Sequence, residues 1–477
     1  MEKKFTLFKS IALPDGFYGK MRKERHSTVY KKNFHYIVID YNNINFSLIR
    51  RRNDKSNMNF FRKMLQIIKK YFLLPQRFLV ILLVTLSVQS CKEQEKNPDL
   101  TLSQEENKKY STWMADSEIQ RNPEGWTLDF NEKPKWEYTH GLIMTSMEKL
   151  YEATGDEKYL KYIKNFSEFM INEEGEIKTY KKSDYNIDRV AGGRYLIGFY
   201  EETGEEKYRM AIEELRDQMR EHPRTSEGGF WHKKVYPYQM WLDGLYMGST
   251  FLARYAAAFD EPKLFDDVAN QFHLIDKYAY SDETGLYHHA WDESKEQRWA
   301  DPETGLSSNY WGRSIGWFSM AVVDVLDYMP KNHPERDRLI DIAQKIASGI
   351  VRYQDDETGV WYQVLDQGVR EGNYLEASAS SMYAYFLLKG VEQGYLDPQY
   401  REAGIKAYGG ILKEFVRKDD DGGISLTDIN GVAGLGGDPY RDGSYEYYIN
   451  EIIRDNDPKG VGPFILASIQ YESLSKN

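Results

Sequence analysis

The chain has 477 residues, of which 41% are hydrophobic, so it can bury a large core. Its formal net charge is −11, which argues against nucleic acid or a polyanionic surface as its main partner. It contains a single cysteine, which excludes a disulfide framework or a cysteine-based metal site within the chain.

The positive charge is concentrated near the N-terminus, where residues 1–91 carry +13 while the rest carries −24. Basic residues around Lys69 precede an apolar run, Phe78 to Val84, which ends shortly before Cys91. With the residues that follow it, this apolar stretch is about a dozen residues long, too short for a membrane-spanning helix of about 20. A basic stretch, a short apolar stretch and a small residue before a cysteine resemble a bacterial lipoprotein signal.

The resemblance implies that Cys91 is lipidated and becomes the mature N-terminus of a periplasmic or cell-surface lipoprotein. The anchor would be the chain's one contact with a membrane, and plain secretion or a cytosolic chain are the alternatives. We therefore expect a signal peptide over residues 64–91 and a charged tether over 92–109. Residues 1–63 have no place ahead of a signal peptide, so we interpret them as a disordered, mis-annotated upstream extension and expect the true start at Met64. This leaves residues 110–477 as the folded domain.

A phrase with the pattern Tyr-x-x-Thr-Gly, followed by acidic residues, recurs at Tyr151–Tyr159 and Tyr200–Tyr208. Looser copies lie at residues 255–265, 327–337 and 390–400. Each copy separates two amphipathic stretches of helix length, such as 141–151 and 157–170. A glycine that ends one helix, followed by carboxylates that begin the next, is typical of a tight bend between helices. The last unit has the poorest copy.

Longer, turn-rich loops built around an acidic residue, a glycine and an apolar residue alternate with these bends. Six long loops on one rim and short bends on the other predict an all-α fold, an (α/α)6 toroid of six hairpins. A linear solenoid has the same alternation but needs polar capping repeats at its ends. We expect the functional site on the rim that carries the long loops.

Each long loop ends in polar and aromatic residues just before a predicted inner helix, so the six loops should converge on one mouth. The candidate site residues are Tyr138, His140, Asp188, His232, Lys233, Gln239, Trp241, Asp243, His289, Trp311, Arg313, Trp317, Glu376, Arg441, Asp442 and Ser444. Aromatic residues make up 14% of the chain, and a sugar ring stacks well on an aromatic face. Most of these rings are expected to fill the core, but those at the mouth predict a sugar site.

Sugar hydrolysis usually needs carboxylates near the scissile bond, one of them able to donate a proton. Asp188, Asp243, Glu376 and Asp442 are the candidates. Asp243 is favoured because it follows Trp241 in an apolar stretch, and an apolar wall favours the protonated acid. The alternative for both Asp243 and Asp188 is that each caps the helix that follows it.

Arg313 lies between Trp311 and Trp317, where a guanidinium flanked by rings can clamp a carboxylate. Pairing with an acidic neighbour on the rim is the alternative. His232 and His289 can bind hydroxyl groups. Because their spacing offers no His-x-x-x-His pair and no cysteine partner, we expect no metal.

Residues 110–475 resemble glycoside hydrolase family 105, the unsaturated rhamnogalacturonyl and glucuronyl hydrolases. The most specific segments are His232–Gly244, Trp311–Trp317 and Lys459–Pro463. The resemblance implies an (α/α)6 barrel that removes the 4,5-unsaturated uronic acid from the non-reducing end of lyase-generated oligosaccharides, with rhamnogalacturonan-type products preferred. It implies no cofactor, and no obligate protein partner is inferred.

The family's reaction is the hydration of an enol ether. The resemblance implies that Asp243 protonates C4, that water adds at C5, and that the resulting hemiketal opens and releases the aglycone, while Asp188 positions substrate or water. It also implies that the substrate contacts are His232, Lys233, Trp241, His289, Trp311, Arg313 and Trp317. Many relatives carry Gly-Thr-Gly-Val-Gly near the C-terminus. Lys459 occupies the threonine position here and would alter substrate preference if it lines the aglycone side.

Three other functions stay open. The enzyme could act on unsaturated glucuronides from ulvan, arabinogalactan or glycosaminoglycans. It could be a sugar epimerase or an inverting glycosidase on saturated sugars, which needs two carboxylates about 6.5–9.5 Å apart. It could also be a non-catalytic lipoprotein that captures oligosaccharides, because a fold alone does not fix a function.

Overall fold

The computed structural model describes residues 23–24, 27–32, 35–40, 45–50 and 109–474. The chain divides into two compact units, Met1–Ser103 and Gln104–Asn477. The predicted signal peptide with Cys91, and the tether up to residue 108, lie outside the described residues. Among the residues that the structure does describe, no helix is both long and apolar enough to cross a membrane.

The first unit contains an antiparallel sheet in the order β1-β2-β3-β4. Its strands are β1 (Lys23–Glu24), β2 (Ser27–Lys32), β3 (His35–Asp40) and β4 (Asn45–Arg50). These strands lie within residues 1–63, for which the sequence analysis expects disorder. The sequence of β3, His-Tyr-Ile-Val-Ile-Asp, is rich in β-branched and aromatic residues, which favour strands. The interpretation of the segment as upstream sequence stays a prediction.

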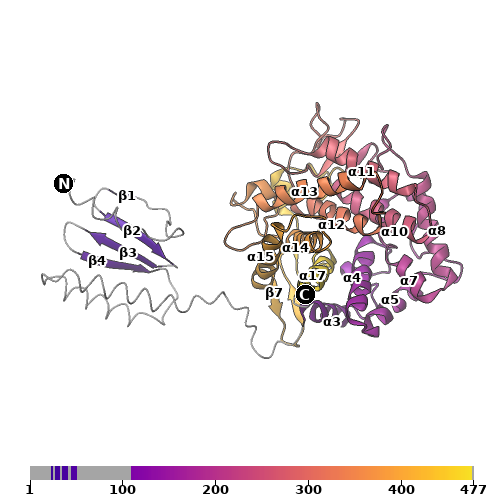
Figure 1. The fold of residues 1–477 in the computed structure, drawn as a ribbon, viewed down its shortest axis with the longest axis horizontal. Helices are drawn as coiled ribbons and strands as arrows, with labels where there is room; N and C mark the ends of the chain where they lie inside the picture. Colours follow the sequence, from indigo (N-terminus) through magenta and orange to yellow (C-terminus); the bar gives the residue numbers. More distant parts are fainter. Residues whose placement is uncertain (1–22, 25–26, 33–34, 41–44, 51–108, 475–477) are drawn as a thin grey trace. The chain divides into compact units, whose positions relative to one another are not determined.

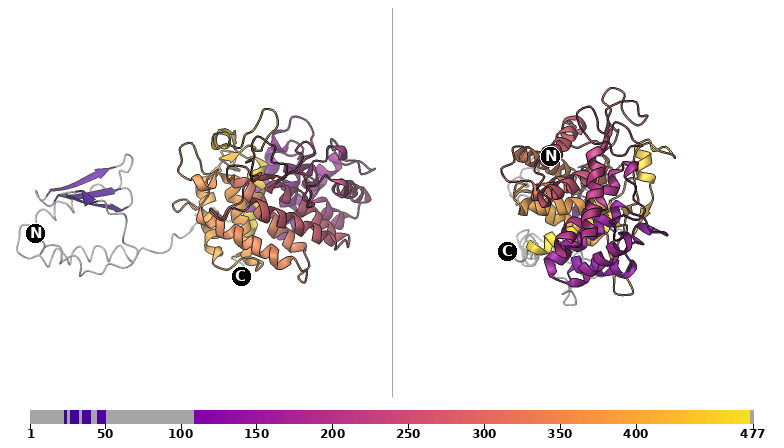
Figure 2. Two further views of the ribbon diagram at one scale, coloured as in Figure 1. Left: turned by 90° about the horizontal axis from the view of Figure 1, so that it is seen from above. Right: turned by 90° about the vertical axis from the view of Figure 1, so that its right-hand side faces the viewer.

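Helices arranged in two layers build the second unit (Figure 1). Within residues 109–474, six inner positions are occupied by α4 (Tyr138–Thr154), α6 (Ile187–Ala191) with α7 (Leu196–Thr203), α9 (Leu242–Gly244) with the π-helix η5 (Leu245–Ser249) and α10 (Thr250–Ala258), α12 (Gly312–Tyr328), α14 (Ala377–Glu392) and α17 (Pro458–Ser473). The outer layer consists of α3 (Tyr110–Arg121), α5 (Glu157–Met170), α8 (Glu206–Glu221), α11 (Leu264–Ala279), α13 (Arg336–Arg352) and α15 (Tyr400–Glu414). Figure 2 shows this unit from two further sides.

Burial distinguishes the two layers. Helix α12 is buried on every face from Gly312 to Leu326, whereas α5 buries one stripe that includes Tyr159, Ile163 and Phe166. Helix α14 packs against α12 and α17, and α17 packs against α4. The inner helices therefore close into a ring, which confirms the predicted (α/α)6 toroid.

Two of the predicted short bends have the expected geometry. Gly155 and Gly204 end α4 and α7 with φ values of 70° and 65°, a left-handed conformation that favours glycine. Asp156 then begins α5 by accepting a hydrogen bond from the backbone N–H of Lys158 at 3.1 Å. The repeated Thr-Gly-acidic phrase thus forms the bend between an inner and an outer helix.

The sixth pair of inner and outer helices, α17 and α3, is joined without such a bend. A sixth bend would follow α17, and at this place the two ends of the described segment, residues 109–474, lie together. The backbone N–H and the hydroxyl of Ser111 in α3 both donate to the Glu472 carboxylate in α17, at 3.0 and 2.7 Å. The contact between Ser111 and Glu472 therefore joins α17 to α3, whereas a bend joins each of the other pairs of inner and outer helices.

The long loops contain short antiparallel strand pairs, which the all-α prediction does not include. They are β5 (Gln239–Trp241) with β6 (Ala290–Asp292), β7 (Val416–Lys418) with β8 (Ile424–Leu426), and β9 (Ile429–Asn430) with β10 (Ile453–Arg454). The first pair joins two different loops of the same rim, whereas the other two pairs each lie within the long loop between α15 and α17. Further short elements on the loops are η3 (Leu128–Phe130), η4 (Lys182–Asp184), η6 (Leu365–Gln367) and α16 (Tyr445–Asn450).

Candidate active site

A cavity of about 320 Å³ opens where the inner helices begin. Tyr138, Asp188, Asp243, Arg313 and Lys459 all line it, and each lies within the first two residues of its helix. Peptide dipoles give a helix N-terminus a partial positive charge, which favours an anionic ligand. The cavity therefore lies on the rim predicted to carry the site, and its size fits a small-molecule site of about 300–1,000 Å³.

Most of the predicted contact residues come together in this cavity. Ten of them line it, namely Tyr138, Asp188, His232, Lys233, Trp241, Asp243, Trp311, Arg313, Trp317 and Arg441. The remaining predicted contacts, His140, Gln239, His289 and Ser444, are not part of its lining.

These remaining side chains support the cavity from behind or lie elsewhere. His140 is fully buried against Phe166, with Nε2 3.3 Å from the Trp126 carbonyl oxygen. Gln239 accepts a hydrogen bond from Nε1 of Trp241 at 3.1 Å. Ser444 caps α16 by accepting from the backbone N–H of Tyr447.

Two of the candidate carboxylates, Glu376 and Asp442, bind backbone N–H groups and do not line the cavity. Glu376 is fully buried at the start of α14, where it accepts from the N–H of Ala379 at 2.7 Å and from the N–H of Asn430 at 2.9 Å. Asp442 is exposed and accepts from the N–H of Ser444 at 2.9 Å. Neither lines the cavity, so the carboxylate pair that it offers from the sequence candidates is Asp188 and Asp243.

Asp188 is buried in a charged cluster. Its Oδ2 lies 2.5 Å from Nζ of Lys233, and its Oδ1 lies 3.2 Å from Nε2 of His232. Burial acts to raise the pKa of Asp188, but the charge of Lys233 and the contact with His232 outweigh it and hold this pKa well below its ordinary value. Asp188 is therefore an ionised acceptor. The helix-cap alternative is wrong, because Asn186 caps α6.

Asp243 lies in a less polar environment. It is 8% exposed, and its Oδ2 lies 3.3 Å from Nε2 of His289, which is fully buried. Burial lowers the pKa of His289, so this imidazole is neutral near pH 7. Its Nδ1 lies 2.7 Å from the hydroxyl of Tyr448. The cap alternative is wrong here too, because Asp243 lies inside α9. Trp241 occupies the N-cap position of this helix, and its side chain makes no capping hydrogen bond.

Local pairing of the loops explains why these partners meet. Trp241 in β5 pairs with Ala290 in β6, and the N–H of Leu242 donates to the carbonyl of His289 at 3.0 Å. His289 is thereby placed beside Asp243. A backbone bridge between Asn186 and Lys233 brings Lys233 beside Asp188 in the same way.

Aromatic rings form much of the cavity wall. Trp241 is stacked with His232, with ring centroids 4.6 Å apart, and with Tyr236 at 5.1 Å. Trp317 contacts Tyr138 edge-on with centroids 6.1 Å apart. Such surfaces suit the apolar face of a sugar ring. Within the described segments, no group of three or more His, Cys, Asp or Glu residues is placed to hold a metal ion.

Arg313 is fully buried, and its terminal nitrogens are occupied. Nη1 donates to the carbonyl of Asn430 and to Oγ of Ser378, the latter at 3.2 Å. Nη2 donates to Oδ1 of Asn430 at 3.0 Å and to the carbonyl of Gly431 at 3.2 Å. Arg313 thus fixes the loop at Asn430 and Gly431, and it has no acidic partner among the described residues.

Lys459, which occupies the position of a family threonine, also lines the cavity. Its ammonium group lies 3.0 Å from Oδ1 of Asp129 and 2.7 Å from Oδ1 of Asp457. These two carboxylates neutralise it and hold it in place. Lys459 therefore joins the loop before α4 to the start of α17.

Several lining residues were not predicted: Asp129, Asn131, Lys135, Glu137, Tyr236, Met247, Gly431, Val432, Ala433 and Arg454. Glu137 directly precedes the predicted contact Tyr138, and Tyr236 lies within the His232–Gly244 segment, so both could have been proposed from the sequence. Residues 431–433 are held at the cavity because Arg313 binds Gly431 and Glu376 binds the preceding Asn430, contacts that no local sequence pattern reveals.

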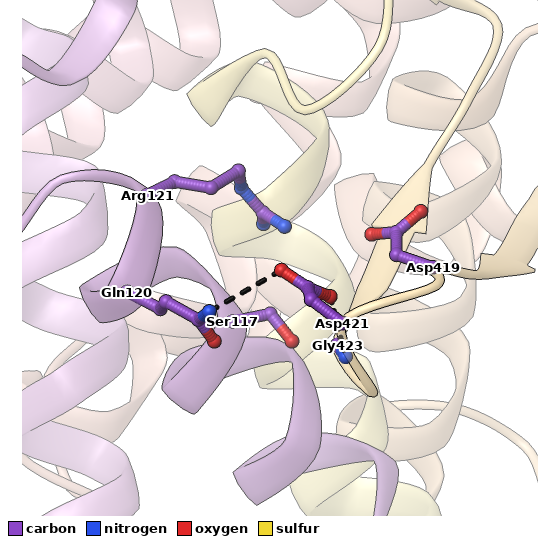
Figure 3. A pocket seen from close by; sticks show the side chains of 6 residues that line it. All are labelled: Ser117, Gln120, Arg121, Asp419, Asp421 and Gly423. Carbon is purple, nitrogen blue, oxygen red and sulfur yellow. Dashed lines mark hydrogen bonds between the residues drawn. The ribbon is translucent and has the colours of Figure 1, made fainter.

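A second, smaller cavity of about 150 Å³ lies between α3 and the loop that joins β7 to β8 (Figure 3). Its wall is held by local contacts, such as the hydrogen bond of 3.2 Å from Gln120 to Asp421. Arg121 donates to the carbonyl of Ile424 at 2.9 Å. None of the predicted contact residues lines it, so the larger cavity is the candidate site.

A helical toroid whose long loops enclose two buried carboxylates among aromatic rings defines a glycoside hydrolase of the helical-barrel type. The sequence model described as Glycosyl Hydrolase Family 88 matches residues 110–475, and the chain belongs to this family. It is accordingly a glycosidase.

The comparison with solved structures agrees. A glycoside hydrolase of family 105 from *C. acetobutylicum* is 49% identical, with a TM-score of 0.74, and the match covers 77% of this chain and 100% of that one. This finding confirms the resemblance to family 105. The unsaturated glucuronyl hydrolase of *Bacillus* sp. GL1 is 14% identical with a TM-score of 0.55, over 76% of this chain and 95% of that one, and shows the shared fold alone.

Two curated relatives complete the comparison. Unsaturated rhamnogalacturonyl hydrolase YesR of *Bacillus subtilis* is 28% identical over 278 residues, which are 57% of this chain and 75% of that protein. Protein Atu3128 of *Agrobacterium fabrum* is 38% identical over 236 residues, which are 48% of this chain and all of that protein.

Proposed function

We propose that this glycosidase removes a 4,5-unsaturated uronic acid from the non-reducing end of lyase-generated oligosaccharides, with rhamnogalacturonan-type products preferred. The observation that carries the proposal is the contrast between two carboxylates in one cavity. Asp188 is ionised and paired with Lys233, whereas Asp243 lies 3.3 Å from a neutral His289. Two carboxyl groups in such different environments take different roles.

In the proposed reaction, Asp243 in its protonated form delivers its proton to C4 of the enol ether. The positive charge that develops at C5 is quenched by a water molecule, which loses a proton to the Asp243 carboxylate. The hemiketal formed at C5 then opens and the aglycone leaves, so the overall change is the addition of one water molecule. One group acts first as acid and then as base.

His289 suits both states of Asp243. A neutral imidazole carries one proton, and either nitrogen can hold it. With the proton on Nδ1, facing the Tyr448 hydroxyl, Nε2 can accept a hydrogen bond from protonated Asp243. With the proton on Nε2, the imidazole can donate to the Asp243 carboxylate. His289 is therefore proposed as a positioning residue behind the acid.

The substrate preference rests on relatives. YesR is an unsaturated rhamnogalacturonyl hydrolase, and two curated relatives from *Alteromonas* and *Formosa agariphila* are unsaturated 3S-rhamnoglycuronyl hydrolases.

The test follows the absorbance of the conjugated enol ether in unsaturated disaccharides from rhamnogalacturonan, ulvan and chondroitin. Wild type should consume the absorbance, fastest with the rhamnogalacturonan product, and Asp243→Asn should be at least about 10³-fold slower, since it lacks the acid and the base. Asp442→Asn, an exposed carboxylate on the same rim, is the matched control and should behave as wild type. No absorbance loss in folded wild type with any disaccharide would reject the proposal.

The cellular location is a separate part of the proposal. The apolar run before Cys91 supports a lipoprotein whose folded domain faces the periplasm or the cell exterior. Expression of wild type and Cys91→Ala in a bacterial host, followed by fractionation and mass spectrometry of the mature N-terminus, tests it. Wild type should be found in the membrane fraction with a diacylated Cys91. An unmodified wild-type N-terminus would exclude the anchor.

A further inference from the structure

We propose that Arg441 binds the carboxylate of the unsaturated uronate. This inference rests on the proposed function, because it assigns one group of that substrate to one side chain. It starts from the six cationic side chains that line the cavity, which are Lys135, Lys233, Arg313, Arg441, Arg454 and Lys459.

Four of these cations already contact a carboxylate of the protein. Lys233 pairs with Asp188, and Lys459 with Asp129 and Asp457. In two further pairs, Lys135 contacts Glu137 and Arg454 lies 3.8 Å from Asp457. A substrate carboxylate at any of these sites would meet a charge that is already neutralised, beside an acidic group that repels it.

Arg313 has no acidic partner among the described residues, but it has no free donor at the surface either. Its terminal nitrogens bind Ser378, Asn430 and Gly431. Its Nε is unpaired, yet this atom is completely buried, so a ligand in the cavity cannot reach it. Arg313 is therefore excluded as the clamp for the substrate carboxylate.

Arg441 is the remaining cation. Nε donates to the carbonyl of Gly436 at 2.9 Å, and Nη2 donates to the hydroxyl of Tyr236 at 2.8 Å and to the carbonyl of Leu435 at 3.2 Å. Within the described residues, Nη1 has no hydrogen-bond partner, and no carboxylate pairs with the guanidinium. Nη1 is also not fully buried. The group is thus held in place with its charge unneutralised and one donor nitrogen free.

The position of Arg441 also fits the reaction. Its partner Tyr236 is stacked on Trp241, whose other stacked neighbour, His232, contacts Asp188. Through its two stacked neighbours, Trp241 thus connects the cation of Arg441 with the ionised carboxylate of Asp188. An unsaturated uronate carries its carboxylate on C5 and its free hydroxyls on C2 and C3. The carboxylate is attracted to Arg441, while the hydroxyls can donate to Asp188.

This orientation would bring the C4=C5 bond toward Asp243. Burial lowers the pKa of His289, Asp243 acts to raise it, and the charges of His232 and Arg441 lower it further, so Arg441 lies near the imidazole that contacts Asp243. Because three hydrogen bonds already fix the guanidinium, little conformational entropy is lost when it binds an anion. Arg441 would therefore both select an acidic sugar and orient it.

The test compares the free acid and the methyl ester of one unsaturated disaccharide. A hydrogen bond to a charged group contributes about 1.5–3 kcal/mol, so wild type should prefer the acid by roughly 10- to 150-fold in kcat/KM. Arg441→Gln should lose this factor on the acid and little on the ester, which removes the preference. Arg454→Gln, a matched arginine of the same cavity wall, should keep it.

Arg441→Lys retains the charge with less suitable donor geometry, and should show an intermediate preference. Retention of the full acid preference by Arg441→Gln, or an equal loss on acid and ester, would overturn the assignment, since loosening of the loop slows both substrates alike. Calorimetric binding of the acid and the ester makes the same comparison without turnover. If wild type fails to consume the absorbance, the proposed reaction fails, and the binding preference still decides the role of Arg441.

Discussion

Replacing Glu376 by glutamine should destabilise the protein and weaken substrate binding, but it should leave the chemistry intact. The buried carboxylate accepts hydrogen bonds from the N–H of Ala379 and from the N–H of Asn430, at 2.7 and 2.9 Å. The first bond holds the start of α14, and the second holds the loop that carries Gly431 to the cavity. Glu376 therefore acts on the site through this loop.

The magnitude follows from the change of one oxygen to an amide nitrogen. In the variant, the new NH2 group must face either Ala379 or Asn430, so that a donor faces a donor. A hydrogen bond to a charged group contributes about 1.5–3 kcal/mol, and a buried donor without an acceptor costs about 1–3 kcal/mol. The free energy of unfolding should fall by about 2–4 kcal/mol. If about 1.4 kcal/mol of this loosens the loop, KM rises about tenfold.

Urea unfolding followed by tryptophan fluorescence measures the first effect, and steady-state kinetics on the preferred disaccharide measure the second. Glu371→Gln, an exposed glutamate in the loop before α14, is the control and should lie within about 0.5 kcal/mol of wild type. Unchanged stability of Glu376→Gln would refute the reasoning. A loss of kcat as large as that of Asp243→Asn, with normal stability, would instead place Glu376 in the chemistry.

Three further predictions concern charge and packing. Because the pKa of Asp188 is lowered on folding, its stabilisation is present above about pH 4 and is lost as the pH falls further. Urea unfolding should therefore show a stability gap between wild type and Asp188→Asn that is constant from pH 7 to 5 and narrows below pH 4, whereas a widening gap would contradict the sign. Burial lowers the pKa of His140 from 6.5 to about 4, so wild type loses stability as the pH falls below 6.5, and His140→Phe should lose about 2 kcal/mol less between pH 7 and 5. Equal losses in both proteins would rule this out. A Cβ on Gly198 would lie 1.9 Å from Nη2 of Arg254, so Gly198→Ala should disrupt the buried pair of Arg254 with Glu148 and destabilise the protein by about 3–5 kcal/mol, which calorimetry would measure as a lower Tm. A variant as stable as wild type would show that the pair can move aside.

The toroid could be predicted from local chemistry because its bends are local. Gly155 and Gly204 need a left-handed conformation, and the acidic residues after them begin the next helix, so a few residues carry the signal. The location of Tyr138, Asp188, Asp243 and other candidates in one cavity follows from the same repeat, since each long loop ends at the start of an inner helix.

The details of the site could not be predicted, because they depend on contacts between distant loops. Pairing of β5 with β6 places His289 behind Asp243 although the two residues lie in different loops. Arg313 lies between two tryptophans in the sequence, which suggested a carboxylate clamp. In the structure its donors bind the loop around Asn430, more than a hundred residues away along the chain. Only the folded chain shows which cation remains free.

The packing of α17 against α4 has a consequence for synthesis on the ribosome. Helix α4 is completed at Thr154, but its inner neighbour α17 ends at Ser473. At roughly 5–20 residues per second, the ribosome needs about 15–65 s to make the intervening chain. During that interval the apolar faces of α4 that α17 later covers stay open to other proteins. Chaperone binding to nascent chains should therefore persist until the last helix emerges, and chains that end before it should aggregate.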